Sequence, residues 1–275
     1  MPQKQSKPAV ALVKSPVRYD AVFTSLELVQ KSVIDRLSAS MRIVIKPDFF
    51  FEKQRMSTSV DSVRAVLDFM LEFTNKKITI AEGMYDGGNM QNLFHKAQLH
   101  ALAEDYGLNF VALHRDGFVT IRLSDKFSVR VAKTILNSDF RVSLAVPKIS
   151  GSNYSGALAN LALGSLISNA KTLARNDKAK LVSSKHYDDA IAEILKVVRP
   201  SLAVVDGFES VANKKSVETN FCVASTDGVA ADVVAAGALY NKLHKKGPKQ
   251  KYLDTCGKAG LGQYDAAKIR LIGNA

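Results

Sequence analysis

One lysine and a run of hydrogen-bonding residues follow an apolar strand that begins at Phe140. Lys148 stands at the end of the strand, and the loop after it lies between Gly151 and Gly156, where an apolar helix begins. Helix starts attract anions through their N–H groups, and open α/β sheets bind ligands at the carboxyl ends of their strands. The pattern therefore predicts a small-anion site made by Lys148 together with Ser150, Ser152, Asn153 and Ser155. A plain strand-to-helix turn solvated by serines explains the same pattern equally well.

The two loop glycines have the spacing seen in phosphate-binding P-loops, but the residues that follow differ. A P-loop continues with a lysine and a hydroxyl residue, and this chain has Ala157 and Leu158 at those positions. The sequence therefore excludes a standard nucleoside triphosphatase. A metal-free nest of backbone amides around the anion stays consistent with it.

Two carboxylates end other predicted strands. Glu82 follows the apolar run 77–81, and Asp206 follows the run 202–205. Because carboxyl ends of parallel strands meet at one edge, we expect Glu82, Lys148 and Asp206 to converge on a common cleft. A carboxylate beside a lysine there could act as a general base or bind a metal, and the identity of any metal or cofactor is left open. Turns and helix caps explain each carboxylate taken alone.

The histidines and nucleophiles give weaker signals. None of the five histidines forms an H-E-x-x-H or an i, i+4 pair, so a histidine-bound metal is not expected. His186 opens a predicted helix after a basic segment, and it either reaches the cleft or lies on the surface. No nucleophile elbow is present, so the sequence predicts no catalytic triad.

The chain is strongly basic, with 38 Lys and Arg against 26 Asp and Glu in 275 residues and a net charge of +12. A surplus of this size attracts polyanions and anionic metabolites alike. Cations gather in segment 242–251 around Gly247–Pro248, which a solvated surface loop also explains. Nucleic-acid binding is therefore the alternative to metabolite binding. The basic segment lacks the interleaved aromatic residues that stack on bases.

Composition also predicts a compartment. The two cysteines, Cys222 and Cys256, are too few for a disulfide framework or a cysteine-bound cluster and are interpreted as reduced thiols. No apolar run approaches the roughly 20 residues of a membrane span. We expect a soluble cytoplasmic protein without a membrane partner, in which residues 1–16 form a flexible basic tail.

The remaining pattern predicts the elements that position these residues. Helical spacing begins after Ser57, where Thr58 and Asp61 resemble a capping box. Further strands are expected at 41–46, 77–81, 109–113, 202–205, 221–224 and 269–272, and helices at 90–106, 156–168, 187–198, 229–243 and 252–258. Asp206–Gly207 should end its strand, and segments 118–123 and 127–131 alternate like a hairpin. The order favours one α/β domain over 17–275, with a mixed, mostly parallel sheet, helices on both faces and a small antiparallel hairpin.

Six blocks of sequence, in this order, resemble those of domain-of-unknown-function family 362. The blocks are Val44–Asp48, Ile80–Gly83, Val146–Lys148, Ser155–Gly164, Val205–Gly207 and Ala224–Asp232, and the resemblance runs from about Met41 to Gly273. It implies an α/β fold with a pocket near the lysine-bearing loop. Some relatives add a ferredoxin-like cluster domain, but we expect no iron–sulfur cluster in this chain.

The candidate pocket departs from the family pattern. The family usually follows the lysine at Lys148 with a second lysine and a histidine, where this chain has Ser150 and Ser152, and it has a lysine where this chain has Ala159. Asn160 and His186 match, and we expect them to orient the anion. The sequence thus favours an enzyme or a ligand-binding protein for a phosphorylated or carboxylated metabolite. A nucleic-acid-associated protein and a non-catalytic scaffold are the alternatives.

Overall fold

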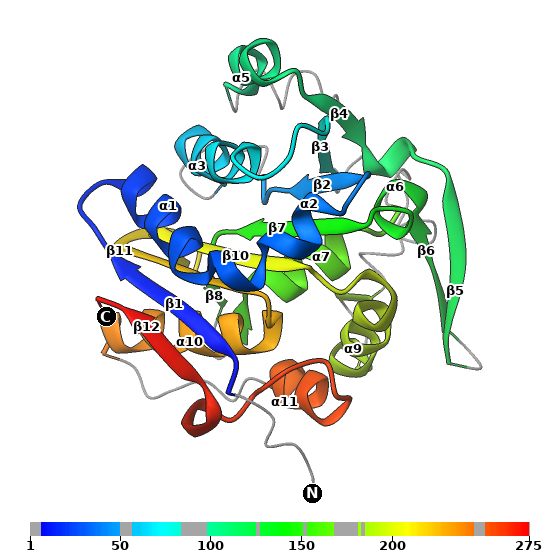
Figure 1. Ribbon diagram of the computed structural model, residues 1–275. Coiled ribbons are helices and arrows are strands. Elements are labelled where there is room, and N and C mark those ends of the chain that lie inside the picture. The colour runs from blue at the N-terminus through cyan, green and yellow to red at the C-terminus, as the bar shows by residue number, and fades with distance from the viewer. Residues whose placement is uncertain are drawn as a thin grey trace, which may run out of the picture.

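The computed structural model describes residues 7–49, 57–83, 98–124, 127–150, 153–167, 181–182, 185–244 and 251–274. These residues form a ten-stranded sheet with helices on both faces and a separate two-stranded sheet (Figure 1). The strands of the large sheet are β1 (Ala9–Lys14), β2 (Ile43–Lys46), β3 (Ile78–Glu82), β4 (Asn109–Ala112), β7 (Phe140–Ala145), β8 (Lys148–Ser150), β9 (Asn153–Ser155), β10 (Leu202–Ala212), β11 (Lys215–Ser225) and β12 (Arg270–Gly273). The small sheet pairs β5 (Phe118–Ser124) with β6 (Phe127–Ala132), as the hairpin prediction expects.

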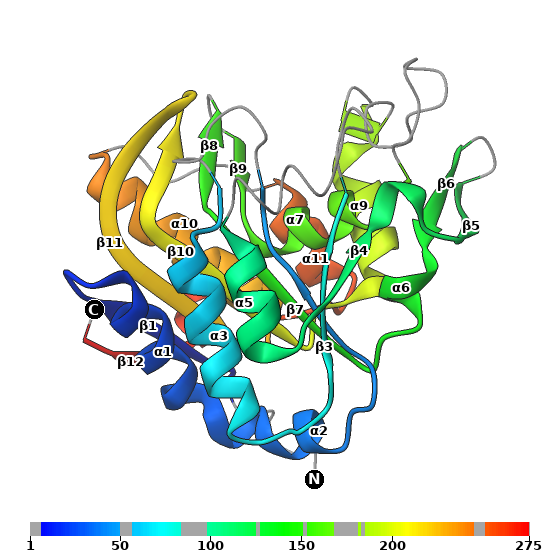
Figure 2. The same ribbon diagram turned by 90° about the horizontal axis from the view of Figure 1, so that it is seen from above.

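The main path of the sheet has the order β12-β1-β11-β10-β7-β2-β3-β4. From β10 to β4 all neighbours are parallel, and β11 is antiparallel to both β10 and β1. The prediction of a mixed, mostly parallel α/β sheet is thus confirmed. The parallel strands place the carboxyl ends of β2, β3 and β7 at one edge, which is the upper edge in Figure 2.

Helices cover both faces. One face carries α1 (Arg18–Val29), α2 (Ile34–Ser38), α3 (Val60–Leu71) and α5 (Leu99–Tyr106), and the other carries α7 (Ala157–Gly164), α9 (Tyr187–Val198), α10 (Gly228–Lys242) and α11 (Lys251–Lys258). The short helix α6 (Lys133–Leu136) and three 3-10 turns (Gln30–Ser32, Leu113–Arg115 and Ala266–Lys268) complete the described elements. Alternation along β2 separates two apolar cores, because Ile43 and Ile45 pack on the α1 side and Val44 packs on the α7 side.

The flexible tail predicted for residues 1–16 is wrong for residues 9–14, which form β1 inside the sheet. β1 is antiparallel to β11 and parallel to β12, and its residues Val10 to Val13 are buried. Its partners are contributed by the last quarter of the chain. The short apolar run therefore becomes a strand only when the C-terminal part folds onto it.

The strand end predicted at Asp206–Gly207 is also wrong. β10 continues through this pair, and β11 begins well before Phe221, so the two form one long hairpin. The chain reverses at Asn213 and Lys214, whose φ angles of 50° and 66° suit a tight hairpin turn. Gly207 is needed for close approach, because a Cβ there would lie 2.3 Å from the ring of Phe221.

The cap of α3 differs from the prediction by one residue. Ser59, rather than Thr58, is the N-cap, and its hydroxyl accepts the N–H of Asp61 at 3.2 Å. Thr58 instead accepts the N–H of Asp48 at 2.8 Å and donates to the carbonyl of Leu144 at 3.1 Å. This threonine therefore ties the segment after β2 to the end of β7.

Candidate functional site

A lysine is buried at the carboxyl end of β2. The Lys46 side chain is 2% exposed, and its Nζ donates to Glu82 Oε1 at 2.8 Å, Asn160 Oδ1 at 2.7 Å and the carbonyl of Pro47 at 2.8 Å. An ammonium has three N–H donors, so its hydrogen-bonding capacity is filled. Because a buried charge is costly unless it is paired and hydrogen-bonded, these acceptors fix Lys46 in one position.

Two glycines make room for this lysine. A Cβ on Gly164 would lie 1.6 Å from Cε of Lys46, and a Cβ on Gly83 would lie 2.9 Å from the carbonyl oxygen of Gly164. The end of α7 therefore packs directly on the Lys46 stem and on the backbone after β3. Any larger side chain at position 164 must displace the lysine.

The partners of Lys46 are themselves held by other groups. Glu82 accepts the N–H groups of Gly83 at 2.7 Å and Phe49 at 3.2 Å. The amide nitrogen of Asn160 donates to the carbonyl of Lys46 at 3.2 Å and to Ser143 Oγ at 3.1 Å. The buried ion pair thus links the ends of β2 and β3 to α7.

A second ion pair lies nearer the surface and joins Lys148 Nζ to Asp48 Oδ2. Their side chains are 21% and 17% exposed, against 2% and 4% for Lys46 and Glu82. Asp48 is two residues beyond Lys46, so segment 46–49 connects the two pairs. Glu82 and Lys148, both predicted from sequence, therefore belong to one continuous group of contacts.

The loop predicted after Lys148 is a short hairpin, β8–β9, in which four predicted side chains share one face. The register pairs Lys148 with Ser155 and Ser150 with Asn153. Alternation therefore places these four polar residues on one side, and the residues between them are buried on the other. Ser152 lies outside the described residues. Figure 2 shows β8–β9 at the upper edge of the sheet.

The first amides of α7 are occupied by a side chain of the protein. The N–H groups of Ala157 and Leu158 donate to the two carboxyl oxygens of Asp232 at 2.8 Å and 3.0 Å. The hydroxyls of Tyr154 and Tyr252 donate to the same carboxyl at 3.2 Å and 3.3 Å. Burial raises the pKa of Asp232 to about 6, and these hydrogen bonds oppose the rise. These two amides are therefore used within the fold rather than presented to a ligand.

Asp206 lies in a different set of contacts. It accepts the Ser62 hydroxyl at 2.6 Å and the N–H of Phe208 at 3.1 Å, and Arg18 Nε lies 3.5 Å from the same carboxyl. Burial raises the pKa of Asp206, and Arg18 opposes the rise. Ser62 and Arg18 come from α3 and α1, whereas Asn160 reaches Lys46 from α7. The described contacts therefore group Glu82 with Lys46 and place Asp206 on the other face of the sheet.

His186 is exposed at the N-terminal end of α9, and its carbonyl accepts the N–H of Ala190 at 3.0 Å. Because α9 leads into the amino end of β10, its own start lies toward the same edge as β8–β9 (Figure 2). The basic segment that precedes His186, which is residues 171–180, lies outside the described residues, as does most of the basic segment 242–251.

Sequence reasoning missed the central residue of this site. The sequence pattern places Lys46 in a strand and in one block of the family resemblance but not in the site, although a lysine that continues an apolar run and precedes a proline is a detectable signal. Among the described residues, no group of three or more His, Cys, Asp or Glu lies close enough to hold a metal ion. None of the described helices is both long enough and apolar enough to cross a membrane.

Comparison with known proteins identifies a family and a fold. Residues 43–237 match the family described as Domain of unknown function (DUF362). The structure of the lactate racemase apoprotein from Thermoanaerobacterium thermosaccharolyticum is similar, with a TM-score of 0.54 and 16% identity. This likeness covers 87% of the present chain but only 58% of that chain, and it shows the fold alone. No curated protein matches the sequence. Because the family match covers most of its length, the chain belongs to the DUF362 family.

Proposed function

We propose that the chain binds a small carboxylate at the edge formed by the ends of β2, β3 and β7. The observation that carries this proposal is the buried Lys46–Glu82 pair next to the partly exposed Lys148–Asp48 pair. Buried ion pairs contribute little net stability compared with apolar residues of similar size. Charged groups held at the carboxyl ends of parallel strands are instead typical of ligand sites.

Each residue has a role in this proposal. Lys148 binds the carboxylate of the ligand, and Ser150, Asn153 and Ser155 donate or accept hydrogen bonds from the same face of the hairpin. Asp48 pairs with the same amine. Asp48 is therefore the candidate general base, since it is the partly exposed carboxylate beside the ligand. Lys46, Glu82 and Asn160 hold the strand ends in place.

The choice of a carboxylate over a phosphorylated metabolite rests on two points. The described site pairs one lysine with one carboxylate and adds neutral donors, which suits a singly charged ligand better than a phosphate. The structural neighbour is named for lactate, a small hydroxycarboxylate. A hydroxyl on the ligand would find partners among the two serines and the asparagine of β8–β9.

The test is a thermal-shift comparison of lactate, glycolate, inorganic phosphate and phosphoglycolate. A ligand that binds only the folded chain raises the melting temperature. We expect the two hydroxycarboxylates to raise it in the unmodified protein but not in Lys148→Ala. Lys258→Ala is the matched control, because Lys258 also pairs with a carboxylate, Asp254, at 2.6 Å but lies on α11. An equal rise in the melting temperature of Lys148→Ala would refute the assignment of Lys148 to the site. A rise with phosphate and phosphoglycolate alone would refute a carboxylate as the ligand.

The net charge of +12 supports nucleic-acid binding as a second candidate. Binding of this kind releases counterions, so its affinity must fall steeply as salt is added. A short oligonucleotide titrated at low and high salt tests this candidate. Salt-resistant binding of hydroxycarboxylates with no oligonucleotide binding at low salt would exclude it.

A further inference from the structure

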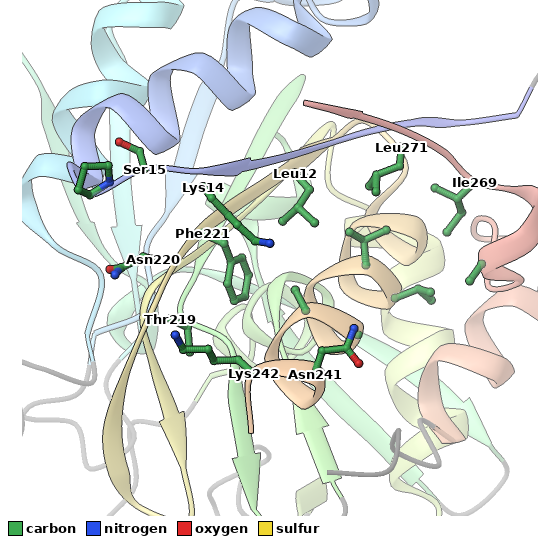
Figure 3. A pocket seen from close by; sticks show the side chains of 16 residues that line it. Leu12, Lys14, Ser15, Thr219, Asn220, Phe221, Asn241, Lys242, Ile269 and Leu271 are labelled. Atoms are coloured by element: carbon green, nitrogen blue, oxygen red, sulfur yellow. The ribbon is translucent and has the colours of Figure 1, made fainter. Parts of the chain in front are cut away.

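A groove of about 880 Å³ lies between α10 and the strands β1, β11 and β12 (Figure 3). These strands stand at the opposite end of the sheet order from β2 and β3, so the groove is separate from the Lys148 site. Its volume lies within the range of roughly 300–1,000 Å³ that is usual for small-molecule sites. The size of the groove therefore suits a small ligand.

The two lysines of this groove lie toward one end, beside the Phe221 ring, and two aliphatic side chains lie toward the other. Figure 3 shows Lys14 and Lys242 toward the end with Thr219 and Asn220, and Ile269 and Leu271 toward the other. The register agrees, because Lys14 pairs with Phe221 at the carboxyl end of β1, whereas Ala9 at its start pairs with Arg270, next to Ile269. Leu271, which lines the groove, pairs with Val10, so four residues of β1 separate the two ends by about 13 Å.

A glycine on α10 leaves the middle of the groove open. Gly237 lies inside the helix and lines the groove, and a Cβ added there would meet no atom within 4 Å. Glycine is a poor helix former, and no neighbouring atom requires it at this position. The wall of α10 is therefore indented where an extended apolar chain would pass.

The charges of the lining residues are of one sign. Lys14 and Lys242 are exposed, and the described residues that line the groove include no Asp or Glu. An amphipathic ligand with one anionic head suits both the lysines and the apolar lining of the groove. Its head pairs with the lysines, and its body covers Leu12, Val233 and Ile269.

We propose that this groove binds a medium-chain fatty acid. The carboxylate lies between Lys14 and Lys242, and the alkyl chain runs past Gly237 toward Ile269 and Leu271. Burial of the chain supplies most of the affinity, because each methylene removed from water adds to it, and the lysines select the charge of the head.

Isothermal titration calorimetry with decanoate tests the proposal. Butanoate has the same head with a short chain, and decylamine has a similar chain with the opposite charge. We expect decanoate to bind and the two analogues to bind at least tenfold more weakly. Gly237→Leu fills the groove and should lower decanoate affinity at least tenfold without lowering the melting temperature. Ala101→Leu is the matched control, because Ala101 is exposed on α5.

The lysine pair is tested in the same way. Replacing both Lys14 and Lys242 by Gln should weaken decanoate about tenfold, as expected for the loss of charge-assisted hydrogen bonds. The control is Lys215→Gln, which replaces an exposed residue at the start of β11 and should leave the affinity for decanoate unchanged. Lys148→Ala should also retain decanoate, which separates this site from the carboxylate site.

Three outcomes would overturn the proposal. The first is decanoate affinity that Gly237→Leu does not change. The second is decylamine that binds as tightly as decanoate, which would show that the lysines do not select an anionic head. The third is evidence that another partner covers the groove. Such evidence would be dimerisation that Gly237→Leu abolishes, or binding of phosphatidylcholine vesicles without binding of decanoate.

Discussion

Replacing Glu82 by Gln should destabilise the protein far more than a surface substitution. The change keeps the shape of the side chain but removes the charge that Lys46 Nζ contacts at 2.8 Å. Lys46 is 2% exposed, so its ammonium would stay buried without a counterion. Breaking a buried ion pair on one side costs about 3–5 kcal/mol of the free energy of unfolding. Because Asn160 and the Pro47 carbonyl still accept from the amine, we expect about 3 kcal/mol.

The double variant Lys46→Met with Glu82→Gln should recover most of this loss. Methionine fills a similar volume and leaves no buried charge, and such replacements are often neutral or stabilising. The assay is urea unfolding followed by circular dichroism. Lys196→Met with Glu193→Gln is the control, because that pair is 47% and 42% exposed. It should change the unfolding free energy by less than about 1 kcal/mol.

The reasoning is refuted if Glu82→Gln costs no more than the exposed control. It is also refuted if the double variant loses as much as the two single variants together. Residues in one ion pair should show a large coupling energy, and additivity would mean that they act independently.

Three other predictions concern two glycines, a buried carboxyl group and a helix cap. Gly164→Ala should destabilise the protein by about 1–3 kcal/mol in urea unfolding, since its Cβ would lie 1.6 Å from Cε of Lys46. Gly237→Ala, whose Cβ would meet no atom, should instead stabilise the protein by up to about 1 kcal/mol. Equal changes in the unfolding free energy of the two variants would contradict the geometry. Folding favours the protonated form of Asp232, whose pKa is raised to about 6, so this stabilisation is lost as the pH rises from about 4 to above 6. Asp232→Asn should therefore show a smaller fall in the urea midpoint over that range, and an identical pH profile would reject this assignment. Ser59→Ala removes the N-cap of α3 and should cost about 1 kcal/mol in thermal unfolding; an unchanged melting temperature would show that the cap contributes nothing.

The parallel centre of the sheet is predictable because its strands are buried on both faces. Strands of this kind read as uninterrupted apolar runs, as Ile43–Ile45 and Ile78–Ile80 do apart from Thr79. The polar face of β8–β9 is predictable for a related reason, since alternate polar residues around Ile149 and Tyr154 share one side.

The long β10–β11 hairpin is not predictable from the local pattern. Asp206–Gly207 resembles a turn. Carboxylates are rarely buried within a strand, so the local pattern indicates that the strand ends there. The strand continues because Arg18 and Ser62, distant in sequence, provide partners for Asp206. β1 is missed for the same reason, since its neighbours lie more than 200 residues further along the chain.

The arrangement of the candidate site also depends on distant partners. Lys46 contacts Glu82 and Asn160, which lie 36 and 114 residues away in sequence. Asp232 reaches the start of α7 across 75 residues. The sequence predicts residue types at the edge of the sheet, but only the folded chain shows that the α7 amides bond Asp232 and that Lys46 is the central cation.

Calorimetric titration of lactate into the unmodified protein, Asp48→Asn and Lys148→Ala tests the central claim most directly. Because the Asp48 carboxylate repels a second carboxylate held by the same Lys148 amine, its neutralisation should tighten lactate binding, and removal of the amine should abolish that binding. Chloride at matched ionic strength controls for nonspecific anion binding. Lactate that binds Lys148→Ala as tightly as the unmodified protein, or that fails to bind any of the three, would contradict the account.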